Sequence, residues 1–225
     1  MEVELLKKVP FFSALKERDL KKMGRLTSIH KYKKDNIILM ESEKGSSLFL
    51  IHKGRVKISR VSDDGKEVIL AILKEGDFFG EMSLLDGQAR SANVTSIEDS
   101  ELLVLKREDF LQILKTHPEL TVVLLKELAQ RIRKSDMQIK SLSLLDAVGR
   151  VASTIIQLAE TTGVTSNDKI VISKLPSQQD IASMAGTSRE TVSRTLHLFI
   201  NENLITKEGN KIIIEDLKKF KSLYI

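Results

Sequence analysis

The sequence of 225 residues contains no cysteine. This absence excludes disulfides, thiolate zinc sites, cysteine-ligated iron–sulfur clusters and cysteine nucleophiles. Long hydrophobic runs are also lacking: the apolar segment 122–125 is among the longest, whereas a membrane-spanning helix needs about 18 apolar residues. Glu2 and Glu4 stand where a signal peptide would be basic. We therefore expect a cytoplasmic protein without a membrane partner.

The net charge of +5 is modest and unevenly placed. Ten Lys/Arg and five Asp/Glu lie in residues 1–40, whereas residues 146–225 carry ten and nine. A basic balance hints at a polyanionic partner. Because the excess is N-terminal, it is a weak guide to where that partner binds. Contact with a protein partner, general electrostatic steering and no role at all remain open for it.

Residues 1–110 carry seven of the eleven glycines, with short apolar or alternating runs between them. Short strands separated by glycine turns about every ten residues are typical of an all-β sandwich or barrel. Asp63-Asp64-Gly65 predicts a hairpin turn, because Asp-Gly tolerates positive φ. A short helix over 13–26 is expected before the sheet. The expected strands are 36–40, 48–52, 55–61, 67–73, 92–95 and 101–105.

From about residue 108 the hydrophobic period becomes helical. A heptad seam with spacings of 3, 4, 3, 4 and 3 follows: Leu125, Leu128, Ile132, Ser135, Ile139 and Leu142. Such a narrow apolar stripe suits an identical partner and predicts a homodimer. The alternative is an amphipathic helix that packs on its own domain. Ser135, the polar member of the seam, either fixes the register or faces a ligand between two helices.

After Asp146 the pattern changes to short, capped helices. Asp146 is expected to cap a helix over 147–160. The segment 177–180 has the residues of a capping box and opens a helix to 185, a turn follows at 186–188, and a second helix covers 189–203. Two short strands, 204–207 and 211–215, form a hairpin. This order predicts a winged helix-turn-helix.

The second of these helices has the side chains of a DNA recognition helix. At about 100° per residue, Arg189, Glu190 and Arg194 share one face, opposite Val192, Leu196 and Phe199. Arginine can bond guanine O6 and N7, and glutamate can accept from cytosine N4. The short polar side chains near the two helix starts suit phosphate oxygens: Ser177, Gln179, Ser188 and Thr191. Two alternatives are a capping box over 187–190, in which Glu190 bonds only its own helix start, and an ordinary solvated helix face.

The segment 76–92 has the residues of a phosphate-binding turn. Gly80 permits a tight turn, and 81–85 can form one helical turn whose free amides face an anion. Arg90 and Ser91 add a guanidinium and a hydroxyl donor, while Glu81 can accept a bond from a sugar hydroxyl. A 3′,5′-cyclic nucleotide would use this whole set. The alternative is a surface turn closed by a Glu81–Arg90 salt bridge.

With both segments in view, the chain resembles the cyclic-AMP receptor protein branch of the Crp/Fnr family of transcription regulators over nearly its whole length. The resemblance rests on Gly80-Glu81, Arg90-Ser91-Ala92, Leu145-Asp146 with Gly149-Arg150, and Ser188-Arg189-Glu190-Thr191-Val192 with Arg194. It implies an α+β fold: an N-terminal β-roll (a jelly-roll cyclic-nucleotide-binding domain) over 1–115, a dimerisation helix and hinge over 116–145, and a winged helix-turn-helix over 146–225.

The resemblance also implies residue roles. Glu81 would take the ribose 2′-hydroxyl, and Arg90 and Ser91 the cyclic phosphate, with backbone support from Gly80 and Met82. Arg189, Glu190 and Arg194 would recognise a TGTGA-like half-site, with Ser188, Thr191 and Gln179 on phosphates.

The residues expected to contact the purine base of the nucleotide depart from the family pattern. Where the cyclic AMP-binding member has two adjacent hydroxyl residues, this chain has Ser135 and Asp136. An ionised Asp136 accepts equally from the amino group of adenine or from the N1–H and N2 donors of guanine. Cyclic AMP is the preferred effector, and cyclic GMP stays open. The absent cysteines exclude iron–sulfur sensing, and the histidines show no metal spacing (His30, His52, His117 and His197).

These observations predict a cyclic nucleotide-responsive homodimer that binds palindromic double-stranded DNA and works with RNA polymerase. A family member that binds DNA without a nucleotide is one alternative. A cyclic nucleotide module that acts on a protein partner is another. An enzyme is not expected, because no nucleophile–base pair, metal cluster or carboxylate pair stands out.

Overall fold

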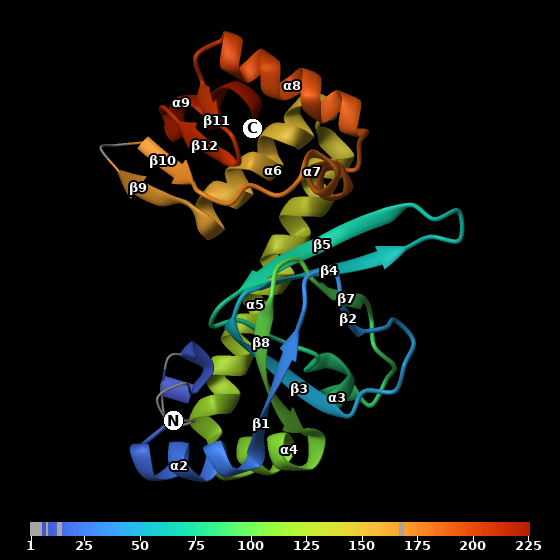
Figure 1. Ribbon diagram of the computed structural model, residues 1–225, viewed down its shortest axis with the longest axis vertical. Coiled ribbons are helices and arrows are strands. Elements are labelled where there is room, and N and C mark those ends of the chain that lie inside the picture. The colour runs from blue at the N-terminus through green and yellow to red at the C-terminus, as the bar shows by residue number, and fades with distance from the viewer. Residues whose placement is uncertain (1–5, 8, 13–14, 167–168) are drawn as a thin grey trace. The chain divides into compact units, whose positions relative to one another are not determined.

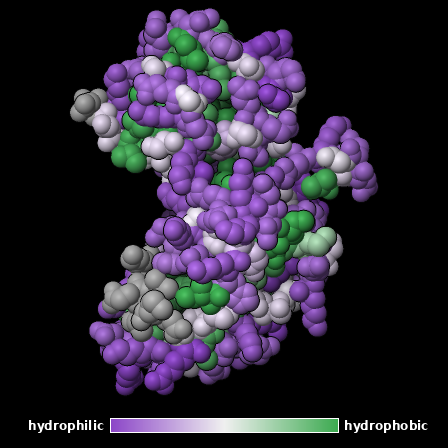
Figure 2. Space-filling model, in the orientation of Figure 1, coloured by the Kyte–Doolittle hydropathy of each residue, from purple (hydrophilic) through white to green (hydrophobic). Residues whose placement is uncertain are grey.

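The computed structural model describes residues 6–7, 9–12, 15–166 and 169–225 (Figure 1). The chain divides into two compact units, Met1–Arg131 and Ile132–Ile225, and the division falls within one long helix. None of the helices in the described ranges is both long and apolar enough to cross a membrane. On the face shown in Figure 2 the surface is mostly hydrophilic, with smaller hydrophobic areas.

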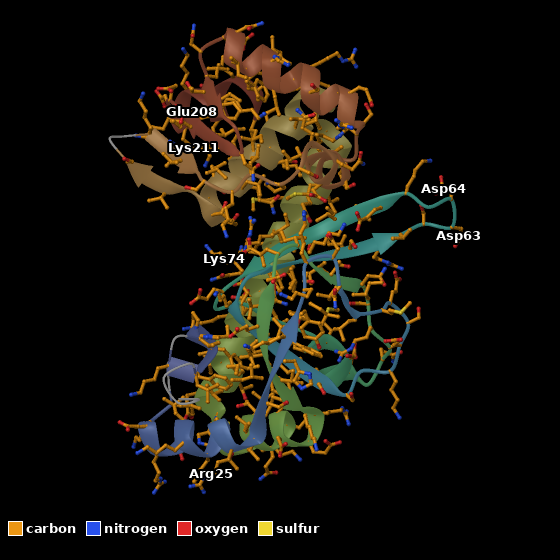
Figure 3. All side chains as sticks on the ribbon, in the orientation of Figure 1. Arg25, Asp63, Asp64, Lys74, Glu208 and Lys211 are labelled. Carbon is orange, nitrogen blue, oxygen red and sulfur yellow. The ribbon has the colours of Figure 1, made fainter. Side chains whose placement is uncertain are left out.

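The first unit contains two four-stranded antiparallel sheets, with strand orders β1-β8-β3-β6 and β2-β7-β4-β5. The strands are β1 Thr27–Tyr32, β2 Ile37–Leu39, β3 Ser47–Lys53, β4 Arg55–Val61, β5 Glu67–Lys74, β6 Phe78–Phe79, β7 Asn93–Ser96 and β8 Ser100–Lys106. Every strand expected from the sequence is present. β1 and β6 were not expected, because β1 is polar and β6 has only two residues. The expected hairpin joins β4 to β5, with Gly65 at φ +80° and Asp63 and Asp64 at its tip (Figure 3).

Helices flank these strands. They are the short 3-10 helix η1 Pro10–Phe12, then α2 Glu17–Leu26, α3 Met82–Asp86, α4 Arg107–Thr116 and α5 Pro118–Leu144. Pro118 separates α4 from α5, because proline lacks the N–H that would continue α4 but suits the first position of a helix. The core contains an aromatic cluster of Phe11, Phe12, Phe78 and Phe110. Leu120 and Leu124 of α5 are buried in the same core.

The apolar stripe predicted along α5 lies largely on its surface. Leu125, Ile132, Ile139 and Leu142 each expose more than half of their area. Leu128 packs instead against the core of the first unit. The alternative of a helix wholly packed on its own domain therefore fits only the N-terminal part of α5.

The second unit comprises the C-terminal part of α5, from Ile132, and the elements that follow it. Its elements are α6 Ala147–Thr162, β9 Val164–Ser166, β10 Lys169–Ile172, α7 Gln178–Ala185, α8 Arg189–Asn201, β11 Ile205–Glu208, β12 Lys211–Ile214 and α9 Leu217–Tyr224. The sheet order is β11-β12-β10-β9. The predicted helix-turn-helix and wing are present, with Glu208 and Lys211 at the wing turn (Figure 3). The strands β9 and β10 and the helix α9 were not predicted.

Local side chains define the helix starts here, as the sequence predicts. The Asp146 carboxylate accepts from the amide of Gly149 and caps α6. Ser177 and Asp180 form the reciprocal capping box of α7. Gly186 takes φ +60° in the turn before α8, where a residue with a side chain would be strained. The predicted α+β class and the order of β-roll, long helix and winged helix-turn-helix are confirmed.

Candidate functional site

The turn after β6 brings the predicted phosphate-binding residues together. Gly80 has φ +85°, and a Cβ there would lie 2.7 Å from Nη1 of Arg90. No side chain larger than hydrogen fits at that position without moving the guanidinium. The single-turn helix α3 follows directly, as predicted, and no side chain in the described structure caps its start.

Arg90 is 6% exposed, and its guanidinium is held from inside the protein. Nη1 donates to the Gly80 carbonyl at 2.6 Å and to Ser83 Oγ at 2.8 Å, and Nη2 donates to the Ser47 carbonyl at 2.8 Å. Burial lowers the pKa of Arg90, and the nearby charges of Glu81 and Glu43 oppose that shift. A guanidinium has five N–H donors, so three bonds leave two for an anion.

Glu81 is 2% exposed, and its two carboxylate oxygens differ. Oε1 accepts from Nη1 of Arg131 at 2.9 Å. Oε2 is buried and has no hydrogen-bond partner among the described residues. The exposed Glu81–Arg90 salt bridge considered from the sequence is therefore wrong, because both residues are buried and Glu81 pairs with Arg131. The unpartnered oxygen suits a hydroxyl donor such as a ribose 2′-hydroxyl.

The other two residues of this group lie at its surface. Met82 is half exposed at the first position of α3, and Ser91 is exposed. Ser91 Oγ lies 3.7 Å from Met82 Sδ. This is a hydrogen bond to a weak thioether acceptor, so a ligand oxygen would compete for the Ser91 hydroxyl. We call the group Gly80, Glu81, Met82, Arg90 and Ser91 the cassette.

Three further residues belong to this arrangement and were not identified from the sequence. Arg131 on α5 also donates to the Phe78 carbonyl at 2.6 Å and lies 4.7 Å from the centre of the Phe78 ring. Ser83 orients Arg90. Position 45 requires glycine, because a Cβ there would lie 2.1 Å from Ser83 Oγ. Arg131 lies one helical turn before Ser135 on the predicted long helix. That spacing is the sequence feature that could have identified Arg131 as part of the site.

Ser135 and Asp136 lie in the second unit, exposed on α5. The cassette lies in the first unit. The structure thus shows these two residues on the accessible surface of the long helix.

On α8, the long polar side chains and the apolar ones occupy different faces. Arg189, Glu190 and Arg194 are exposed, as is Gln179 on α7. Their apolar counterparts are buried in the second core: Val192, Leu196 and Phe199. The exposed polar face of α8 can therefore contact a polar partner while the apolar face stays buried in the core.

The start of α8 is organised by hydroxyl groups. Ser188 caps the helix by accepting from the amide of Thr191 at 3.1 Å, and Thr191 Oγ1 lies 3.5 Å from Nη2 of Arg194. The pKa of Glu190 is lowered, first by its own backbone amide and then by the Ser188 hydroxyl. The capping box considered over 187–190 is wrong, because Ser188 and not Thr187 caps α8, so that Thr191 and not Glu190 occupies the third helical position.

Arg150 joins the end of α5 to the turn before α8. Its guanidinium donates to the carbonyls of Leu145 at 3.1 Å, Ala185 at 2.9 Å and Gly186 at 3.2 Å. Helix C-termini carry unpaired carbonyls and partial negative charge, which a guanidinium satisfies. Elsewhere, no cluster of three or more metal-ligating side chains occurs within the described ranges.

Comparisons with known proteins agree with this geometry. Residues 29–117 match the model of the cyclic nucleotide-binding domain, and residues 149–223 match that of the Crp-like helix-turn-helix domain.

Among curated proteins, the chain is 34% identical over 187 residues to a cAMP-activated global transcriptional regulator CRP from Pasteurella multocida, covering 83% of this chain and 89% of the relative. It is 29% identical over 216 residues to a CRP-like cAMP-activated global transcriptional regulator from Mycobacterium tuberculosis, covering 96% of each. Among solved structures, FixK2 from Bradyrhizobium japonicum has the same fold, with a TM-score of 0.79 at 22% identity over 88% of this chain and 98% of that one.

Proposed function

Because this chain belongs to the Crp/Fnr family of transcription regulators, we propose that it is a homodimeric regulator that binds cyclic AMP and a palindromic, TGTGA-like DNA site. Nucleotide binding is assigned to residues 1–115, dimerisation to 116–145 and DNA binding to 146–225. The proposal includes a cytoplasmic location and contact with RNA polymerase.

The buried, unpartnered Oε2 of Glu81 carries the nucleotide part of the proposal. An unbonded carboxylate oxygen in a buried site is costly unless a donor reaches it. The ribose 2′-hydroxyl supplies that donor, and the two remaining N–H groups of Arg90, together with Ser91, suit one cyclic phosphate. The backbone at Gly80 and Met82 would support the same group. Ser135 and Asp136 would then meet the purine, for which cyclic AMP is preferred over cyclic GMP.

The exposed face of α8 supports direct recognition of DNA. Arg189 and Arg194 would bond guanines, and Glu190 a cytosine. Ser188, Thr191 and Gln179 would contact phosphates and set the position of α8. In a dimer, the two copies of α8 would enter major grooves one helical turn apart.

The exposed stripe on α5 supports the homodimer. Four large apolar side chains on one helix are costly to leave in water, and a second copy of α5 would cover them. Arg131 lies on the same helix and holds Glu81. A shift at the cassette would therefore be transmitted to the dimer helix.

Titration calorimetry tests the effector. We expect the wild type to bind cyclic AMP, with cyclic GMP weaker, and Arg90→Ala to lose both. DNA binding measured by fluorescence anisotropy on a TGTGA palindrome should tighten when cyclic AMP is present. Flat calorimetric traces for both nucleotides would overturn this part of the proposal.

A nucleotide-independent regulator is the second candidate, and one observation favours it. Arg131 already pairs with Glu81, and Ser83 with Arg90, so the cassette is largely satisfied by the protein itself. Specific DNA binding unchanged by either nucleotide would support this candidate. Absence of any specific footprint would point to a module that acts on a protein partner.

A further inference from the structure

A cavity of about 240 Å³ lies within the second unit, lined by the C-terminal half of α5 and by the helices α6, α7 and α9. The cassette contributes no residue to it. The cavity is lined by Lys134, Met137, Gln138, Lys140, Ser141, Leu142, Leu145, Ser153, Thr154, Ile156, Gln157, Glu160, Met184, Lys221 and Ile225. Sites for drug-sized ligands typically enclose about 300–1,000 Å³, so an occupant would be smaller.

Dimerisation through the exposed stripe on α5 would leave most of this cavity accessible. Ser141 follows Ile132 by nine residues, and at about 100° per residue that places them on opposite sides of α5. Lys134, two residues after Ile132, also points away from the stripe. Leu142 is shared between the stripe and the lining, and it lies close to Gly186 in the helix-turn-helix. Pairing of two α5 helices would therefore leave the Ser141 side of α5 uncovered.

The apolar part of the lining can hold a flexible aliphatic chain. Met137 and Leu142 are more than half exposed, although they border a concave surface. Met184 and Ile156 face the same cavity from the other helices. Methionine adapts its shape to an irregular ligand. Covering these side chains would remove apolar area from water.

The charges around the cavity favour a ligand with a negative charge. Glu160 and Lys221 form an ion pair at 2.5 Å and satisfy one another. Lys134 and Lys140 are exposed, and within the described ranges neither pairs with a carboxylate. Two unpaired ammonium groups beside an apolar cavity complement an anionic head group.

We propose that this cavity binds a small amphiphile with an aliphatic chain and an anionic head, such as a medium-chain carboxylate. The chain would lie against Met137, Ile156 and Met184, and the carboxylate would lie near Lys134 and Lys140. Because the lining comes from α5, α6, α7 and α9, the ligand would join the end of the long helix to the helix-turn-helix. The site is separate from the cassette and does not depend on nucleotide binding.

Titration calorimetry on the full-length protein, with and without cyclic AMP, tests the ligand chemistry. Octanoate should bind under both conditions, octan-1-ol at least about tenfold more weakly, and octylamine more weakly still. Hexanoate should bind about 16-fold more weakly than octanoate, at about fourfold per methylene. Equal affinity for octanoate and octan-1-ol would overturn the anionic head, and absence of heat from all four probes would overturn the site.

Variants test the location. Lys134→Gln with Lys140→Gln should reduce octanoate affinity to that of octan-1-ol, whereas Lys126→Gln, an exposed lysine on the same helix outside the lining, should change nothing. Ser153→Leu should fill the cavity and abolish binding of both probes. Ser141→Leu repeats this test from α5. Unchanged octanoate binding in the double glutamine variant and in either leucine variant would contradict the proposal.

Discussion

Nη1 of Arg131 lies 2.9 Å from Oε1 of Glu81, and this bond joins the long helix α5 to the buried carboxylate of the cassette. The glutamate is almost fully buried, whereas the arginine side chain is about a quarter exposed. The pair therefore neutralises a charge that could not otherwise remain in the interior of the first unit.

Removal of Arg131 should destabilise the first unit. Arg131→Ala leaves the Glu81 carboxylate buried and unpaired, which costs about 3–5 kcal/mol. Urea denaturation followed by circular dichroism measures the loss. Arg133→Ala, at an exposed position two residues away, should cost less than about 0.5 kcal/mol. Glu81→Gln in the Arg131→Ala background should recover part of the stability, and no recovery would show that the charge is not the cause.

Gly45 should control the position of Arg90. In Gly45→Ala the new methyl group would press on Ser83 Oγ and approach the guanidinium, so we expect weaker cyclic nucleotide binding by about 1–3 kcal/mol. Ser83→Gly in the same chain removes the clash and should restore much of the affinity. Calorimetric dissociation constants for the four chains of this double-mutant cycle give the coupling energy. A zero coupling energy would mean that the two positions act separately.

The two arginines on α8 should contribute to sequence recognition. Arg189→Ala or Arg194→Ala should cost about 1–3 kcal/mol of discrimination at one base pair. Fluorescence anisotropy with a set of single-base variants of the palindrome measures it. Arg25→Ala, on α2 of the first unit (Figure 3), is the matched control and should leave discrimination unchanged. Equal weakening on specific and random DNA would argue against direct recognition.

Tyr224 should make the second unit sensitive to alkaline pH. Burial and the hydrogen bond to Glu202 raise the pKa of Tyr224 to about 12, above its ordinary value of 10.0. The unfolded chain therefore loses this proton first, so the contribution is full below about pH 10 and is lost as the pH rises toward 12. Thermal melts across this range should show a steeper fall for the wild type than for Tyr224→Phe. Parallel curves would contradict the assignment.

The stripe on α5 should hold the dimer together. Ile132→Glu places two carboxylates, one per subunit, at the same apolar contact, and we expect the dimer dissociation constant to rise at least about 100-fold. Light scattering after size exclusion measures the mass. Lys126→Glu changes charge on the same helix outside the stripe and should leave the dimer intact. A dimer that survives Ile132→Glu would show that another surface holds the subunits.

Local patterns predicted most of the fold, because helix periods, caps and glycine turns depend on neighbouring residues. Asp146, the Ser177–Asp180 box and the Asp63–Gly65 turn are examples. β1 and β6 depend on pairing with β8 and β3, which no short window contains. β10 likewise pairs with β12, about forty residues further along the chain.

The cassette shows the same limit. The sequence indicated that Glu81 and Arg90 lie close together through a short loop, and only the alternative interpretation paired them with each other. Their actual partners, Arg131 and Ser83, follow from burial, because each buried charged group must find bonds within the folded unit. Arg131 is fifty residues away from Glu81, so only the packing of α5 against β6 identifies it.

Arg150 has a mechanical consequence. Its guanidinium is anchored to carbonyls at the end of α5 and at the end of α7, so these two helix ends are linked through one rigid, planar group. A rotation of the last turn of α5 would therefore strain the bonds of Arg150 to the end of α7 and to the turn before α8. Arg150 thus braces the segment at Leu145 against the turn before α8, while the burial of Val192, Leu196 and Phe199 in the second core holds α8 itself.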